Sequence, residues 1–215
     1  MYAQIDSRLK TYGLMARGGF HPRDGDQVPG HARTVIMIGN AGHDMWRVFS
    51  GNQSHTQHPL DTWTRNVLAP IAEELSCRVV YPFQGPPYYP FQKWAMQADN
   101  VTPSPIGPLI HPQFGLWHAY RAAFLFHDVL PLPDKAEGPT PCESCQDKLC
   151  LDTCPVDAFS HENYDVAACR QHIARPEGRD CLKFGCQART ACPVGKEYIY
   201  HPDQADFHMR HFLVS

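Results

Sequence analysis

The sequence has no long apolar run and no excess of one charge. A membrane-spanning helix needs about 18 consecutive apolar residues, and the longest candidates here, such as Val35–Ile38, have only the length of strands. Nineteen Lys and Arg residues face twenty-two Asp and Glu residues, so the formal net charge is -3. No basic stripe is present to meet phosphates. We therefore expect neither a nucleic-acid partner nor a membrane partner.

The N-terminal segment also lacks the features of an export signal. Residues Met1–Asp6 contain no basic region, no apolar region and no paired arginines. An apolar fraction of 43% with 19% charged residues excludes the composition of a disordered chain. At 215 residues the chain is long enough for a larger and a smaller domain. We expect a cytoplasmic protein with two unequal domains.

Cysteine is almost absent from three quarters of the chain and abundant in the remaining quarter. Eight of the nine cysteines lie between Cys142 and Cys192, and Cys77 stands alone. An odd total with this clustering argues against a disulfide framework and indicates a metal-binding segment. Cys77 itself is expected to be a buried strand thiol that behaves as a small apolar side chain.

Two cysteine groups in this quarter end in Cys-Pro. The first has the spacing C-x2-C-x4-C-x3-C-P, and the second has the spacing C-x4-C-x5-C-P. In two-cluster ferredoxins, three closely spaced thiolates bind one iron-sulfur cube and the fourth cysteine of the run binds the other cube. The first group is Cys142, Cys145, Cys150 and Cys154; the second is Cys181, Cys186 and Cys192, with Cys169 between them on an expected helix from 165 to 174.

Eight thiolates are the number that two 4Fe-4S clusters need. The ferredoxin wiring assigns one cluster to Cys142, Cys145, Cys150 and Cys192. It assigns the other cluster to Cys154, Cys169, Cys181 and Cys186. Zinc also accepts four thiolates and is the alternative. Zinc fingers usually present paired C-x2-C knuckles, whereas this segment has one, so we predict iron-sulfur clusters.

The rest of the chain shows local helix and strand signals and an expected division into domains. Helices are expected over 6–17, 62–75 and 91–98, and buried strands over 33–39 and 77–81, whereas the apolar segment 117–129 fits either state. Residues 130–141 are rich in proline and typical of a linker. The expected domains are 1–137 and 138–200, followed by a tail, 201–215, that packs back on the first domain.

Aromatic rings, prolines and glycines gather in two segments, 85–92 and 106–121, as the pocket of a planar organic cofactor requires. Ordinary core packing is the alternative. The runs Gly85-x-x-Tyr88-Tyr89 and Ile110-His-Pro-x-Phe-Gly-x-Trp-x-Ala-x-Arg121 resemble two motifs of the cobalamin C-type processing and trafficking proteins. This resemblance covers roughly residues 30–133. It implies a nitroreductase-like α+β fold that binds cobalamin and reductively removes its upper ligand.

The same resemblance implies which residues bind the cofactor. The expected lining of the corrin pocket is Tyr88, Tyr89, Phe91, Leu109 and Tyr120, and Arg121 matches an arginine near a thiol co-substrate. Phe91 stands where the family has glutamine, and Pro90 stands where it has tyrosine. The thirteen histidines form no standard ligand trio, so no protein ligand to cobalt is expected.

The domain order is similar to that of epoxyqueuosine reductase and the reductive dehalogenases, in which a corrinoid domain precedes a two-cluster ferredoxin domain. This chain is much shorter than either and lacks a twin-arginine signal. We predict an α+β corrinoid-binding domain followed by a ferredoxin-like domain. Electrons from an external donor would enter at the Cys154 cluster, pass to the Cys142 cluster and reduce cobalt to Co(I) or dealkylate the corrinoid. The alternative is a ferredoxin-type carrier that docks a partner enzyme and binds no corrinoid.

Overall fold

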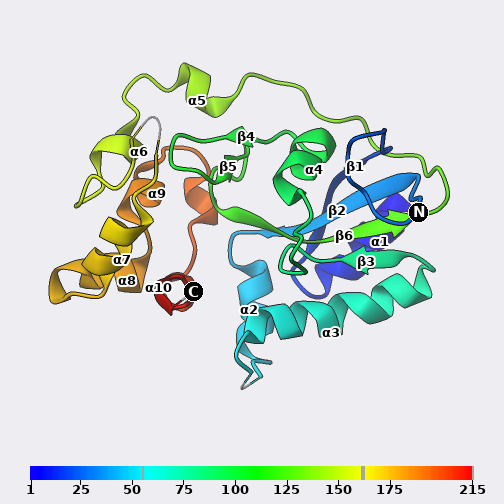
Figure 1. The fold of residues 1–215 in the computed structure, drawn as a ribbon, viewed down its shortest axis with the longest axis horizontal. Helices are drawn as coiled ribbons and strands as arrows, with labels where there is room; N and C mark the ends of the chain where they lie inside the picture. The colour runs from blue at the N-terminus through cyan, green and yellow to red at the C-terminus, as the bar shows by residue number, and fades with distance from the viewer. Residues whose placement is uncertain (55, 161–162, 215) are drawn as a thin grey trace. The chain divides into compact units, whose positions relative to one another are not determined.

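A computed structural model of the chain describes residues 1–54, 56–160 and 163–214. It divides into two compact units. The first unit comprises Met1–Asn100 with His118–Gly138, and the second comprises Val101–Trp117 with Pro139–Ser215. Figure 1 labels the elements of both units. Each unit is described by itself below.

The first unit is built on a four-stranded antiparallel sheet with the strand order β1-β2-β6-β3. The strands are β1 (Met15–Phe20), β2 (Thr34–Ala41), β3 (Arg78–Val80) and β6 (His118–Phe126). Every residue of β2 is buried, because a strand with neighbours on both edges and apolar residues on both faces has no contact with water. The sheet is the core of this unit.

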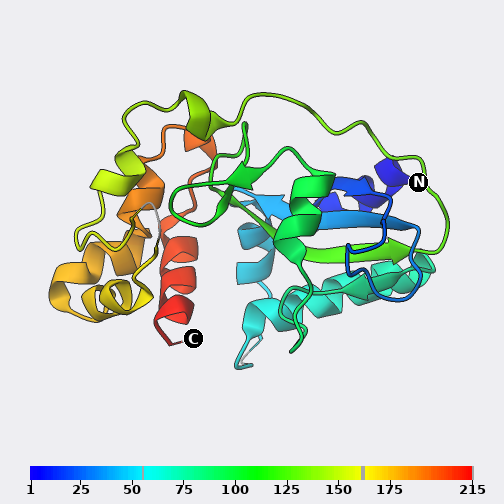
Figure 2. The same ribbon diagram turned by 45° about the horizontal axis from the view of Figure 1, so that its top comes forward.

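Four helices cover this sheet: α1 (Tyr2–Lys10), α2 (Asp44–Ser50), α3 (Pro59–Glu74) and α4 (Phe91–Ala98). In Figures 1 and 2, α3 runs beside β3, with which it is in contact. The apolar residues of α3 recur at helical spacing, so Leu60, Trp63, Leu68 and Ile71 are buried on one side. The helix continues through Pro70.

The second unit consists of short helices and one small hairpin. The hairpin pairs β4 (Thr102–Pro103) with β5 (Leu109–Ile110). The helices are α5 (Pro141–Ser144), α6 (Leu149–Asp152), α7 (Val166–Ile173), η1 (Pro176–Gly178), α8 (Arg179–Phe184), α9 (Gln187–Ala191), η2 (Lys196–Tyr198) and α10 (Pro202–Val214). The last and longest helix, α10, packs against α8 and α7, as both views show in red.

Several expectations from the sequence differ from this fold. The helix expected over 6–17 ends at Lys10 and is followed by β1, because pairing with β2 outweighs the local preference of residues 15–20. The ambiguous segment 117–129 contains strand β6, which pairs with β2 on one side and β3 on the other.

The expected division of the chain also differs. Residues 101–117 belong to the second unit and not to the domain expected over 1–137. The expected tail is helix α10, which is part of the second unit. Within the ranges that the structure describes, no helix is long and apolar enough to cross a membrane.

Candidate metal centres and cofactor-binding residues

Four cysteines of the second unit line one cavity of about 320 Å³, and they are the set expected for the first cluster: Cys142, Cys145, Cys150 and Cys192. We call them the first quartet. Cys142 lies on α5, Cys145 caps its C-terminus, Cys150 lies on α6 and Cys192 follows α9. Between α5 and α6 the chain turns at Lys148, whose φ of 43° is left-handed. The Nζ of Lys148 donates a hydrogen bond to the carbonyl oxygen of Cys142 at 2.6 Å.

The thiols of the first quartet affect one another. Burial raises the pKa of Cys142 and Cys150, and the neighbouring charge of Cys192 raises both further. The positive charge of Lys148 acts in the opposite direction on both thiols. Mutual repulsion of this kind is relieved when a cationic group binds among the sulfurs.

The other four cysteines line a second cavity: Cys154, Cys169, Cys181 and Cys186. We call them the second quartet. The volume of this cavity, about 20 Å³, is smaller than that of the first. Cys169 lies on α7, Cys181 lies on α8 and Cys186 caps the N-terminus of α9. Helix α7 begins where the sequence predicts, because the side chain of Asp165 accepts a hydrogen bond from the backbone N–H of Ala168 at 2.8 Å.

A backbone N–H group donates to one sulfur of the second quartet, and others lie near a second sulfur. The N–H of Ala158 donates to the Sγ of Cys154 at 3.3 Å. Burial raises the pKa of Cys186 to about 11, although the nearby backbone N–H groups of Arg189 and Ala188 lower it. These donors stabilise negative charge on sulfur, and a metal-bound cysteine carries that charge as a thiolate.

The structure therefore brings together, in two separate cavities, the two sets of cysteines that ferredoxin wiring assigns to two clusters. Their role as ligands stays a prediction. Among the described residues, no group of three or more His, Cys, Asp or Glu side chains is placed to hold a single metal ion. The cysteines line the walls of cavities instead.

The residues expected to bind a corrin lie in different places. Tyr88 is 66% exposed and lines a hollow of about 430 Å³ together with His58, Arg65 and Phe83. Tyr89 stacks on Trp94 with 5.6 Å between ring centroids. Phe91 also packs against Trp94 and is a buried residue of α4. Leu109 lies on β5 in the second unit.

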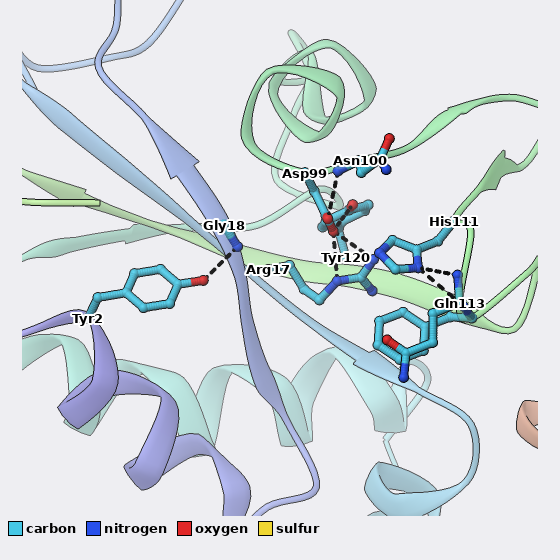
Figure 3. A network of polar contacts seen from close by, with 9 residues as sticks. Tyr2, Arg17, Gly18, Asp99, Asn100, His111, Gln113 and Tyr120 are labelled. Carbon is cyan, nitrogen blue, oxygen red and sulfur yellow. Dashed lines mark hydrogen bonds and ion pairs between the residues drawn. The ribbon is translucent and has the colours of Figure 1, made fainter. Parts of the chain in front are cut away.

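Tyr120 and Arg121 are adjacent on β6, and each is held by a polar partner. The hydroxyl of Tyr120 donates to the Oδ2 of Asp99 at 2.9 Å, and the Nε of Arg17 donates to the same oxygen at 2.8 Å (Figure 3). Burial raises the pKa of Tyr120 well above its usual range. The Nε of Arg121 donates to the Oδ1 of Asn40 at 2.9 Å.

The ion pair of Arg17 and Asp99 is a buried feature that sequence reasoning missed. The side chains of Arg17 and Asp99 are 3% and 13% exposed, and the Arg17 guanidinium lies 5.1 Å from the ring centroid of Tyr120. Figure 3 also shows the hydroxyl of Tyr2, which accepts a hydrogen bond from the backbone N–H of Gly18 at 2.7 Å. The three residues Arg17, Asp99 and Tyr120 are far apart in the sequence, so no local pattern links them.

The comparisons with known proteins give matches among solved structures alone. No family model matches the chain, and no curated protein matches it. Epoxyqueuosine reductase from Bacillus subtilis matches with a TM-score of 0.51 and 14% identity, over 94% of this chain and 68% of that one. An epoxyqueuosine reductase bound to an epoxyqueuosine-modified tRNA-Tyr stem loop matches with a TM-score of 0.55 and 15% identity, over 94% and 69%. A selenomethionine-labelled form matches with a TM-score of 0.54 and 15% identity, over 94% and 68%.

The chain has an epoxyqueuosine reductase-like fold. This likeness confirms, at the level of the fold, the mixed α+β layout that the sequence predicts. The predicted cobalamin C-type and reductive dehalogenase likenesses stay predictions. The stem loop in the second structure belongs to that protein, and it weighs weakly against our expectation of no nucleic-acid partner.

Proposed function

We propose that this chain is an iron-sulfur oxidoreductase that carries electrons from an external donor to a cofactor in its first unit through two 4Fe-4S clusters. One observation carries the proposal: the eight clustered cysteines form two quartets, and each quartet lines its own cavity. Four thiolates are the ligand set of one such cluster. When bound, the clusters supply one-electron transfer, and the protein supplies the ligands and their surroundings.

The chemistry of both quartets fits iron-sulfur clusters. All eight candidate ligands are cysteine sulfurs without disulfides, and soft thiolates favour such clusters over hard cations. Burial raises the pKa of Cys142, Cys150, Cys181 and Cys186, so these thiols keep their protons until iron replaces them. At about 20 Å³ the second cavity is narrower than a cube of iron and sulfide, so we expect its walls to move apart on cluster binding.

Arg189 fixes the helix that joins the two quartets. It lies on α9, between Cys186 of the second quartet and Cys192 of the first. Its guanidinium lies 4.5 Å from the ring centroid of Trp117 and 4.6 Å from that of Tyr200. Its Nε donates to the carbonyl oxygen of Leu116 at 3.1 Å. A planar cation held in this way orients α9 and keeps both ligands in place.

A corrinoid is the cofactor that we propose for the first unit. The two sequence motifs and the fold likeness support it. The side chains fit one corrin pocket less well, because Phe91 is buried in the core and the hydroxyl of Tyr120 is held by Asp99. These placements weigh against a corrin held by Phe91 and Tyr120. The second candidate is a ferredoxin-type carrier whose first unit docks a partner enzyme.

Anaerobic purification with iron, zinc, sulfide and corrinoid assays on one preparation tests these proposals. We expect about eight iron and eight sulfide per chain, as two clusters require, and we expect added hydroxocobalamin to bind with a changed absorption spectrum. If both clusters are present and no corrinoid binds, the result would support the ferredoxin-type carrier. Zinc without acid-labile sulfide would contradict an iron-sulfur function altogether.

A further inference from the structure

A tyrosine packs beside the second quartet. Tyr164 lies against the apolar cluster that contains Cys154, Cys169 and Cys186. The ring of Tyr164 is held by stacking on Phe159, at 4.6 Å between centroids and 18° between planes, and by Phe212 at 6.3 Å and 13°. Packing against both phenylalanine rings limits the movement of the tyrosine ring, so its hydroxyl is held beside the second quartet.

A histidine lines the same cavity with a ring nitrogen that has no partner. His172 lies three residues after Cys169 on α7, so both side chains are on one face of the helix. The Nε2 of His172 is buried and has no hydrogen-bond partner among the residues that the structure describes. Buried polar atoms are seldom left unpaired, and this one belongs to a residue that lines the cavity of the second quartet.

Hydrogen-bond donors matter at this site because two of its four cysteines are buried. Cys154 and Cys181 are 9% and 6% exposed, whereas in the first quartet Cys192 alone is buried and Lys148 lines the cavity. Reduction of a cluster adds negative charge to its sulfurs. Burial alone disfavours that charge and lowers the potential, whereas O–H and N–H donors stabilise the charge and raise the potential.

We propose that Tyr164 and His172 are positioning residues that raise the reduction potential of the second cluster by donating hydrogen bonds to its sulfurs. This inference rests on the proposed function, because it requires a cluster at the second quartet. Tyr164 donates its hydroxyl proton to the sulfur of Cys169, and His172 presents Nε2–H to a sulfur in the cavity. Neither residue lines the first cavity, so the effect is confined to one cluster.

Redox titration of the full chain, followed by electron paramagnetic resonance under anaerobic conditions, tests the proposal. Cys142→Ser and Cys181→Ser variants assign each signal to its quartet. Tyr164→Phe removes one hydroxyl and keeps the stacked ring. We expect it to lower the potential of the second cluster and to leave the first unchanged. The matched control is Tyr198→Phe in the same unit, which removes a hydroxyl that accepts a hydrogen bond from Gln113 at 2.9 Å; both potentials should stay as in the wild type.

Two His172 variants give a second test, which can be used if Tyr164→Phe fails to retain its second cluster. His172→Met removes the N–H donor and should lower the potential of the second cluster, whereas His172→Gln keeps an N–H donor and should restore most of the shift. Unchanged potentials with both clusters at full occupancy would overturn this inference alone. A wild-type chain without either cluster signal would overturn the proposed function and this inference together.

Discussion

The two units of the chain have different kinds of interior. In the first unit, strand β2 is wholly buried and pairs with β6, and residues such as Val35, Ile36 and Ile38 have no exposed surface. In the second unit, Ile106, Ile110 and Leu116 pack with cysteines of both quartets. Apolar burial is therefore sufficient for the first interior. The second interior contains thiols of both quartets, and under the proposed function we expect its stability to depend on the clusters that they bind.

Removal of the clusters should produce the largest difference in stability between the two units. We expect anaerobic chelation of iron to unfold the second unit, because metal binding supplies on the order of 10 kcal/mol of folding free energy in small metal-dependent domains. In hydrogen exchange, the backbone amides of residues 163–214 should lose their protection, and those of β2 and β6 should keep it. Equal protection of both units after chelation would show that the second interior is stable without metal.

The converse test destabilises the first unit and leaves the second intact. Asp99→Ala leaves the Arg17 guanidinium, whose side chain is 3% exposed, without this carboxylate. Breaking a buried ion pair costs about 3–5 kcal/mol, so the urea midpoint of the first unit should fall while the iron content stays constant. The matched control is Asp206→Ala, which removes a more exposed pair with Arg210 on α10 and should cost less than about 1 kcal/mol. A loss of iron in Asp99→Ala would contradict the independence of the two units.

A smaller effect is expected where one cation orders the helix between the quartets. Arg189→Met removes the hydrogen bonds to Leu116 and the contacts with Trp117 and Tyr200. We expect the second unit of the loaded protein to lose about 1–3 kcal/mol, measured as a lower melting temperature. Arg179→Met, at an exposed arginine on α8, is the control and should melt as the wild type does. Equal melting of the two variants would refute the orienting role of Arg189.

The smallest effect is expected at the ninth cysteine. Cys77 lies in the first unit, immediately before β3, and its backbone N–H donates to the carbonyl oxygen of Ala72 at 2.9 Å. Burial raises the pKa of its thiol to about 12, so it should resist alkylation at neutral pH. Cys77→Ala should keep the full iron content, whereas Cys186→Ala should lose about half. Iron loss in Cys77→Ala would place a metal ligand outside the quartets.

Local patterns in the sequence predict part of this fold well. Helices α3 and α4 lie close to the expected ranges of 62–75 and 91–98, because apolar residues at helical spacing determine which side is buried. The spacing and number of the cysteines predict two quartets. In the structure, each expected quartet lines one cavity. These signals lie within short stretches of sequence, so reading the chain alone finds them.

Other features depend on contacts between distant residues. Strands β1 and β6 form through pairing with β2, which no short pattern reveals. Arg17 and Asp99 are 82 residues apart, and Tyr164 packs on Phe212 of α10, which is distant in the sequence. Helices α5, α6 and α9 have four or five residues, too few to show a period.

Iron and sulfide analysis of three anaerobic preparations tests the central claim most directly: the wild-type chain, Cys142→Ser and Cys181→Ser. Two independent quartets predict about eight iron per wild-type chain and about four in each variant, with the surviving signal differing between the two variants. A variant that keeps all its iron, or zinc in place of iron in all three, would contradict the assignment of one cluster to each quartet.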